Sequence, residues 1–242
     1  MAAEGTPRGW YTDPWKQGDL RWWDGNTWTG HFVSSMPRSA PALQEETIAA
    51  RRARIALLVA IPTGILMNVG FHFAIDDIRR FIREFDAVGG SSTWEFDRSP
   101  FYLLSQVANL AQIVIGVLFL MWFHQSAVNA RAVGLPARRQ PGTGVAGFLI
   151  PVLNLWWPYQ STCDLFPPGH PARRRVLRWF LLWVVGGFVS AAAMVIGGLT
   201  DGWTGWLYLI VPLVQLPLAA LTAREVISEA VEVHASLAGT SR

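Results

Sequence analysis

The sequence predicts an all-α polytopic membrane domain of four spanning helices, preceded by a small all-β module rich in tryptophan. Of 242 residues, 51% are apolar and only 15% are charged, whereas soluble domains have about 25% charged residues. The charges cluster in short blocks between uncharged apolar runs. These runs cover residues 55–75, 100–123, 179–200 and 202–223. A bilayer core about 30 Å thick needs about 20 helical residues, and such a run satisfies its backbone in hydrocarbon only as a helix.

The rest of the composition argues against several classes of function. The basic residues are almost all arginines at the predicted helix ends, where they indicate topology, so we expect no nucleic-acid partner. The single cysteine, Cys163, excludes an intramolecular disulfide and a multi-cysteine zinc site. The five histidines lack metal-ligand spacing, so we expect neither a metal nor a cofactor. The polar N-terminus lacks the apolar region of a cleavable signal peptide.

Residues 9–33 predict the β module, after a disordered stretch at 1–8. Strand formers at Gly9–Thr12, Leu20–Asp24 and Thr27–Val33 surround a Gly25-Asn26 turn with the positive φ that a hairpin needs. Because a sheet this small buries little apolar surface, its aromatic side chains are expected to supply most of the core. The alternative is an exposed aromatic groove for an extended or proline-rich peptide. The candidate aromatic residues are Trp10, Tyr11, Trp22, Trp23 and Trp28.

The motif W-Y-x-D-P at 10–14, followed by R-W-W-D-G-x-x-W-T at 21–29, resembles domain of unknown function twenty-five-ten. The sequence departs from that family at Thr12, where proline is usual. The resemblance covers about 25 residues. It implies a bacterial, and in particular actinobacterial, membrane protein, and it implies no known activity.

Residues 34–54 are expected to connect the module to the membrane, first as a proline-bearing tether (34–43) and then as a juxtamembrane helix (44–54). Residues 76–88 carry apolar side chains at helical spacing opposite charged ones, which predicts a separate amphipathic helix on the bilayer surface or over the bundle. The last residues, 236–242, are expected to form a tail.

A fifth apolar stretch, Val145–Trp157, is too short to cross a bilayer and contains Pro151. If it does not cross and the N-terminus is cytoplasmic, eleven arginines flank the spans on the inside and four on the outside. Because the positive-inside rule favours this arrangement over five spans, we expect four spans with both termini in the cytoplasm. Residues 145–160 then form a re-entrant or interfacial hairpin on the inner side of the cell membrane.

The segments W-F-H-Q-S-A-x-N-A-R-A-x-G at 122–134 and G-F-L-I-P-V-L-N-L-W-W-P-Y-Q at 147–160 resemble domain of unknown function forty-three twenty-eight. That resemblance is expected to cover roughly residues 55–235. It implies a multi-pass bacterial membrane domain without assigned chemistry.

Polar side chains inside the spans are costly and are the first candidates for function. They would either bond neighbouring helices or line a polar path. The residues are Asn68, His72, Ser105, Asn109, Gln112 and Gln215.

The hairpin provides the stronger candidate site. Arg131 and Asn154 are expected to bind an anionic lipid headgroup or ligand at the inner interface, unless the asparagine only satisfies backbone groups freed by proline. The full candidate set is Asn129, Arg131, Pro151, Asn154 and Pro158.

No nucleophile–base pair, paired intramembrane aspartates or H-E-x-x-H helix occurs, so we do not expect an enzyme. The first hypothesis is a membrane scaffold that presents the aromatic module to a protein partner in the cytoplasm. The alternative is a small-molecule or lipid transporter or binder that uses the hairpin. Membrane lipids are expected partners in either case, and homo-oligomer formation stays open.

Overall fold

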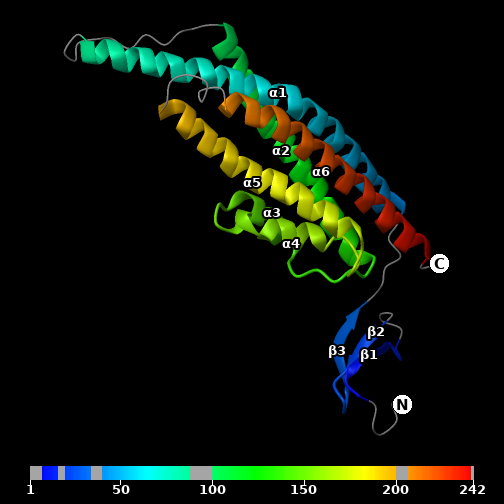
Figure 1. Ribbon diagram of the computed structural model, residues 1–242. Helices are drawn as coiled ribbons and strands as arrows, with labels where there is room; N and C mark the ends of the chain where they lie inside the picture. Colours follow the sequence, from blue (N-terminus) through cyan, green and yellow to red (C-terminus); the bar gives the residue numbers. More distant parts are fainter. Residues whose placement is uncertain (1–6, 16–19, 34–39, 88–99, 200–206, 241–242) are drawn as a thin grey trace.

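A computed structural model describes residues 7–15, 20–33, 40–87, 100–199 and 207–240 (Figure 1). It is mostly helical and has a small N-terminal antiparallel sheet, as the sequence predicts. The strands are β1 (Gly9–Thr12), β2 (Leu20–Trp23) and β3 (Trp28–Val33). The helices are α1 (Ala40–Ala87), α2 (Pro100–Ala132), α3 (Pro141–Leu149), the 3-10 turn η1 (Leu153–Leu155), α4 (Trp157–Cys163), α5 (Ala172–Leu199) and α6 (Leu207–Thr240).

The β module is a three-stranded sheet in the order β1-β2-β3. The second hairpin closes with residues Asp24–Thr27, where Gly25 has a φ of 97° that favours glycine. The Asp24 carboxylate accepts hydrogen bonds from the backbone N–H groups of Asn26 (2.8 Å) and Thr27 (2.6 Å). The predicted turn is therefore present, and it takes one residue more from each flanking strand than the prediction gave it.

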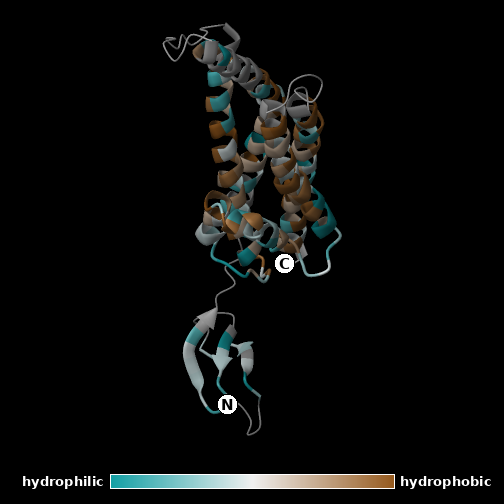
Figure 2. Cartoon of the chain, turned by 60° about the vertical axis from the view of Figure 1, so that its left-hand side comes forward, coloured by the Kyte–Doolittle hydropathy of each residue, from teal (hydrophilic) through white to brown (hydrophobic). Residues whose placement is uncertain are grey.

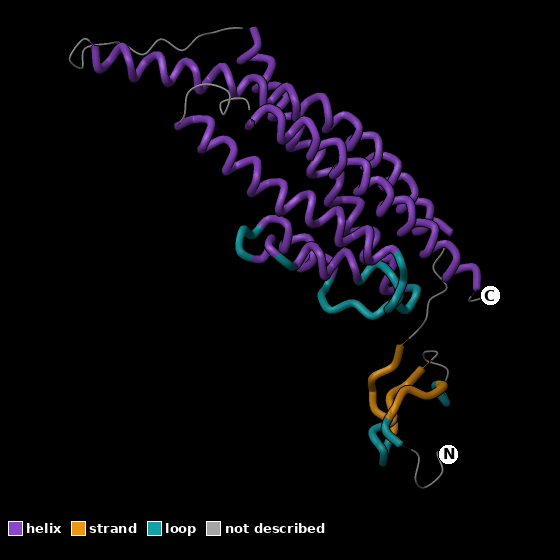
Figure 3. Tube along the Cα trace, viewed as in Figure 1, coloured by secondary structure: helices purple, strands orange, loops and turns teal. Residues whose placement is uncertain are grey.

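Four helices, α1, α2, α5 and α6, are long and apolar enough to cross a membrane, which confirms the four-span architecture. The main helix pairs are α1 with α2, α1 with α6, and α5 with α6. These pairings give the helix order α2–α1–α6–α5. Figure 3 shows the long helices lying side by side.

Two predicted helix boundaries differ from those observed. Residues 76–88 do not form a separate amphipathic helix, because α1 continues without a break from Ala40 to Ala87, and its first residues come from the predicted tether. At the other end of the chain, α6 extends to Thr240 and includes most of the predicted tail. In α1 helical hydrogen bonding continues into the polar sequence on both sides of the apolar run, and in α6 it continues into the polar sequence after the apolar run.

The segment α3–η1–α4 (residues 141–163, here the hairpin segment) lies at the end of the bundle where the C-terminus also lies (Figures 1 and 2). It consists of short helices that do not span the bundle, with α3 packed on α2 and α4 packed on α5. Gly147 permits this compact turn, because a Cβ there would lie 2.8 Å from the Cβ of Trp157. The buried core is concentrated at this end, here called the hairpin end, around Trp122, Phe123 and Phe166.

Candidate functional site

At the hairpin end the carboxylate of Glu46 is buried, with the residue 1% exposed. Its Oε1 accepts a hydrogen bond from Ser126 Oγ at 2.9 Å and lies 2.8 Å from His234 Nδ1. Its Oε2 accepts a hydrogen bond from Asn129 Nδ2. These four side chains, here called the Glu46 cluster, bring together α1, α2 and α6.

The contact made by the second ring nitrogen of His234 limits how protons can be placed on His234 and Glu46. His234 Nε2 lies 2.9 Å from the carbonyl oxygen of Leu165, and because a carbonyl only accepts, Nε2 carries a proton. Either His234 is an imidazolium beside a Glu46 carboxylate, or a protonated Glu46 donates to Nδ1. In both cases the pair has no net charge, which is the form in which ionisable groups are tolerated in a core.

The geometry does not match a catalytic triad. In a triad the histidine lies between the hydroxyl and the carboxylate, whereas here Ser126 and His234 both contact Glu46 Oε1. All four side chains are buried, with no surface for a substrate. The Glu46 cluster therefore holds helices together.

The structure separates the residues proposed for the hairpin site. Asn129 is buried in the Glu46 cluster, while Arg131 Nη2 donates to the carbonyl oxygen of Arg139 at 2.6 Å. Asn154 lies in η1, and its buried Oδ1 has no hydrogen-bond partner among the described residues. Pro151 is exposed in the turn after α3, and Pro158 is buried in the first turn of α4. Binding of a headgroup by Arg131 and Asn154 stays a prediction.

The loop between α2 and α3 is pinned to the hairpin segment by its own arginines. Arg139 Nη2 donates to Gln160 Oε1 at 2.6 Å, and its guanidinium lies 4.2 Å from the ring centroid of Trp157. The Asp164 carboxylate accepts a hydrogen bond from the backbone N–H of Arg138 at 2.9 Å. Beside Arg139 and Ser161 is a void of only about 10 Å³, which is room for one water molecule at most.

A larger cavity of about 380 Å³ lies between α2 and α5, where these helices face each other across the bundle. The two helices contribute Phe119, Trp179 and Trp183, and α3 adds Phe148. The indoles of Trp179 and Trp183 stack with their centroids 5.7 Å apart and an angle of 7°. The remaining lining residues are apolar or small, except for two amides: Leu57, Ala60, Gln112, Ile115, Gly116, Leu120, Leu149, Gln215, Leu216, Ala219, Ala220 and Ala223.

Gln112 and Gln215 are the two amide side chains of the cavity wall. Gln112 Nε2 donates to the carbonyl oxygen of Ala60 (2.9 Å) and to Thr63 Oγ1 (3.0 Å), which ties α2 to α1. Gln215 Nε2 donates to the carbonyl oxygen of Leu182 at 3.0 Å, which ties α6 to α5. All three hydrogen bonds join neighbouring helices, the simpler of the two roles expected for intramembrane polar groups.

Asn68, Ser105 and Asn109 do not line this cavity. Asn68 Nδ2 donates to the carbonyl oxygen of Gly64 in its own helix, at 2.8 Å. Ser105 is buried whereas Asn109 is exposed, so the predicted polar stripe on α2 does not share one environment. The side chain of His72 lies outside the described part of the structure.

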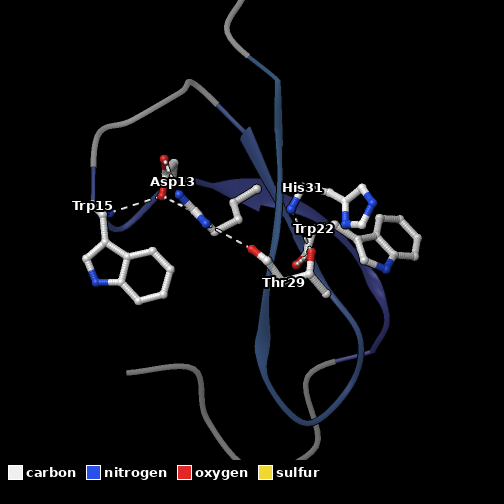
Figure 4. Close-up of polar contacts among 6 residues, drawn as sticks. Asp13, Trp15, Trp22, Thr29 and His31 are labelled. Carbon is white, nitrogen blue, oxygen red and sulfur yellow. Dashed lines mark hydrogen bonds and ion pairs between the residues drawn. The ribbon is translucent and has the colours of Figure 1, made fainter.

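In the β module, a buried ion pair joins the aromatic side chains in the interior. Arg21 donates through Nε to Asp13 Oδ1 at 2.8 Å and through Nη1 to the carbonyl oxygen of Thr29 at 2.9 Å (Figure 4). Tyr11 and Trp23 each pack edge to face on Trp28, with centroids 6.2 and 5.2 Å away. These contacts agree with a structural role for those aromatics.

Sequence reasoning passed over several of these groups. Asp13 and Arg21 fall within the recognised motif, but their ion pair was not predicted. Glu46 and His234 gave no signal, because neither has metal spacing or lies inside an apolar run. The one available clue was an acidic residue close to the start of a spanning helix.

The fold defines a multi-pass helical membrane protein with an N-terminal β module. Residues 89–202 match the family model described as domain of unknown function (DUF4328), and residues 9–41 match the one described as protein of unknown function (DUF2510). Both resemblances are thereby confirmed. The match to DUF4328 covers less of the chain than expected, because α1 and α6, with Glu46 and His234, lie outside it. No curated protein and no solved structure matches this chain.

Proposed function

We propose that the four-helix domain binds a lipophilic molecule from the bilayer in the cavity between α2 and α5. The observation that carries the proposal is the cavity itself, which at about 380 Å³ falls within the range of about 300–1,000 Å³ that is usual for small-molecule sites. Its wall has the expected composition, mostly aromatic and aliphatic side chains with a few polar groups. The hairpin segment contributes Phe148 and Leu149 to this wall, so the proposal keeps the hairpin as part of a ligand site.

The position of the cavity supports supply from the membrane. On either side of it, α2 and α5 carry exposed apolar side chains, among them Val117 on α2 and Val185 on α5. In a bilayer such surfaces face the acyl chains, so a lipophile reaches the cavity by lateral diffusion without crossing water. The void beside Arg139, in contrast, is too small for a headgroup.

The arginine distribution supports an orientation in which the hairpin end and both termini are cytoplasmic. Trp156, Leu149 and Val152 are exposed on the hairpin segment. Exposed apolar and tryptophan side chains on such a segment favour the membrane interface. The cavity would then open to the inner leaflet.

A matched pair of glycines tests the proposal. Gly116 lines the cavity and a Cβ there meets no atom within 4 Å, so Gly116→Phe fills the cavity. Gly187 is equally open, but it does not line the cavity, so Gly187→Phe is the control. We expect mass spectrometry of protein extracted in mild detergent to find a stoichiometric lipophile with the native chain and with Gly187→Phe, and to find it lost with Gly116→Phe. Equal amounts in both variants would contradict the proposal.

A second candidate function follows from one feature of the β module. The indole of Trp15 is 56% exposed, and the Arg21 guanidinium lies 4.5 Å from its ring centroid. This exposed aromatic side chain supports the scaffold hypothesis, in which the module docks a protein partner. In the full-length protein, Trp15→Ala should abolish a cross-link that His31→Ala, an exposed control on the same sheet, leaves intact. Identical cross-linking patterns for the two variants would exclude docking at Trp15.

A further inference from the structure

We infer that the ligand of the α2–α5 cavity is an uncharged lipophile with a hydrogen-bond donor, such as the hydroxyl of a neutral glyceride or of a long-chain alcohol. This inference rests on the proposed function, because it names the chemistry of the molecule in that cavity. Two observations support it: the direction in which the Gln112 and Gln215 amides donate their hydrogen bonds, and the absence of charged side chains from the cavity wall.

The wall contains no charged side chain among its sixteen residues. Moving an unpaired ion into an apolar site costs far more than an ordinary binding interaction returns. A carboxylate or a phosphate in the cavity would find no arginine or lysine, because the arginines of the hairpin end are not part of the wall. An anionic group is therefore excluded from the cavity itself.

A cationic group is also disfavoured. Cations bind aromatic side chains over the ring face. In this wall Trp179 and Trp183 stack on each other, and Phe148 lies 5.8 Å from Trp183 with its plane tilted by 34°. The ring faces are thus largely occupied by other rings, and no carboxylate lies nearby in the wall to balance a positive charge.

The two amides specify which polar group the ligand carries. Each glutamine uses its Nε2 as the donor to a neighbouring helix, and the described residues provide no donor to either Oε1. Neither Oε1 is among the fully buried atoms without a partner, so both retain accessible surface. A carbonyl oxygen only accepts. A ligand group that pairs with either of these oxygens must therefore donate.

Glycines hold both amides in this arrangement. A Cβ at Gly186 would lie 2.4 Å from Gln215 Cγ, and a Cβ at Gly64 would lie 3.1 Å from Gln112 Nε2. Since each side chain is seated against a glycine of the adjacent helix, its Nε2 stays on that helix. The acceptor is consequently pre-organised before a ligand arrives, which reduces the entropic cost of binding.

Two photoreactive probes test the inference on the full-length protein in phosphatidylcholine nanodiscs. One is a diazirine analogue of hexadecanol, and the other is the matching analogue of hexadecane. Saturable labelling of the α2 and α5 wall is measured by peptide mass spectrometry, with unlabelled hexadecanol, hexadecanoate, hexadecyltrimethylammonium and dioleoylglycerol as competitors. We expect the hexadecanol analogue to bind about threefold to tenfold more tightly than the hexadecane analogue, as one hydrogen bond would give. We expect neither ionic competitor to displace it. Displacement by dioleoylglycerol at lower concentration would assign the hydroxyl to a glyceride rather than a simple alcohol.

The variants Gln112→Leu and Gln215→Leu should bring hexadecanol down to the affinity of hexadecane. Their retained labelling by the hexadecane analogue shows that the cavity is still folded. If one variant loses this labelling, the ratio of the two probes in the other variant decides. Equal binding of hexadecanol and hexadecane to the native chain, or stronger competition by an ionic probe, overturns the inference while the proposed function stands. If neither analogue labels the wall, the proposed function itself fails.

Discussion

At the residue scale, small side chains at helix contacts decide how the polar groups of this protein are placed. Gly186 and Gly187 are adjacent in α5. Only Gly186 lies at a close helix contact, because Gln215 packs against it, whereas the position of a Cβ at Gly187 is open. Hydrophobicity does not distinguish the two glycines, since the difference arises from the rotation of α5 relative to α6.

We therefore expect Gly186→Ala to destabilise the protein by about 1–3 kcal/mol, the range for an overpacked contact. Gly187→Ala should be neutral or slightly stabilising, because alanine is the better helix former. Thermal unfolding of the detergent-solubilised protein measures both. Because the clash is with Gln215, the double variant Gly186→Ala, Gln215→Ala should lose less stability than the two single variants added together. Strict additivity would show that the contact is absent.

At the element scale, hydropathy predicted the spanning runs but not the full helices. Residues 44–54 were expected to be a juxtamembrane helix, and they are the start of α1. This polar part of α1 is held by a partner that is distant in the sequence, because Glu46 contacts His234, 188 positions away on α6. The ends of α1 and α6 thereby stabilise each other beyond the apolar runs.

Removing one member of the Glu46 cluster should be costly, since a buried group loses its partner. We expect Glu46→Ala to lower the free energy of unfolding by about 3–5 kcal/mol. Glu46→Gln should cost less, because an amide can still bond to His234 and Asn129. Glu45→Ala, at the exposed neighbouring position, is the control and should change little. Unfolding temperatures in detergent give the order, and a Glu46→Ala variant as stable as Glu45→Ala would show that the cluster is not structural.

At the scale of the whole molecule, the helix order α2–α1–α6–α5 leaves α2 and α5 apart, and the aromatic side chains and the cavity occupy the space between them. The hairpin segment closes this space at one end, with α3 on α2 and α4 on α5. The prediction of four spans is confirmed by the four long apolar helices. The orientation across the membrane stays a prediction from arginine counting.

Cysteine labelling in intact cells tests that orientation. Ser92→Cys should react with a membrane-impermeant maleimide, whereas Pro168→Cys should react only after the cells are opened. Reaction of both from the same side would contradict four spans. The native Cys163 gives little background because it is buried, and burial raises the pKa of its thiol, which keeps it in the unreactive neutral form at pH 7. Replacing Cys163 removes the remaining signal.

Local sequence patterns were enough to predict the four spans, the β module and its turn, because bilayer thickness and strand and turn preferences act on neighbouring residues. For Gln112 and Gln215 they left two roles open, bonding to a neighbouring helix or lining a polar path. The tertiary structure decided which partners these amides have, and it revealed the Glu46 cluster, the Asp13–Arg21 pair and the cavity. Each of these depends on contacts between segments that the local pattern treats independently. A polar residue such as His234 becomes part of a site only when packing removes it from water beside a complementary group.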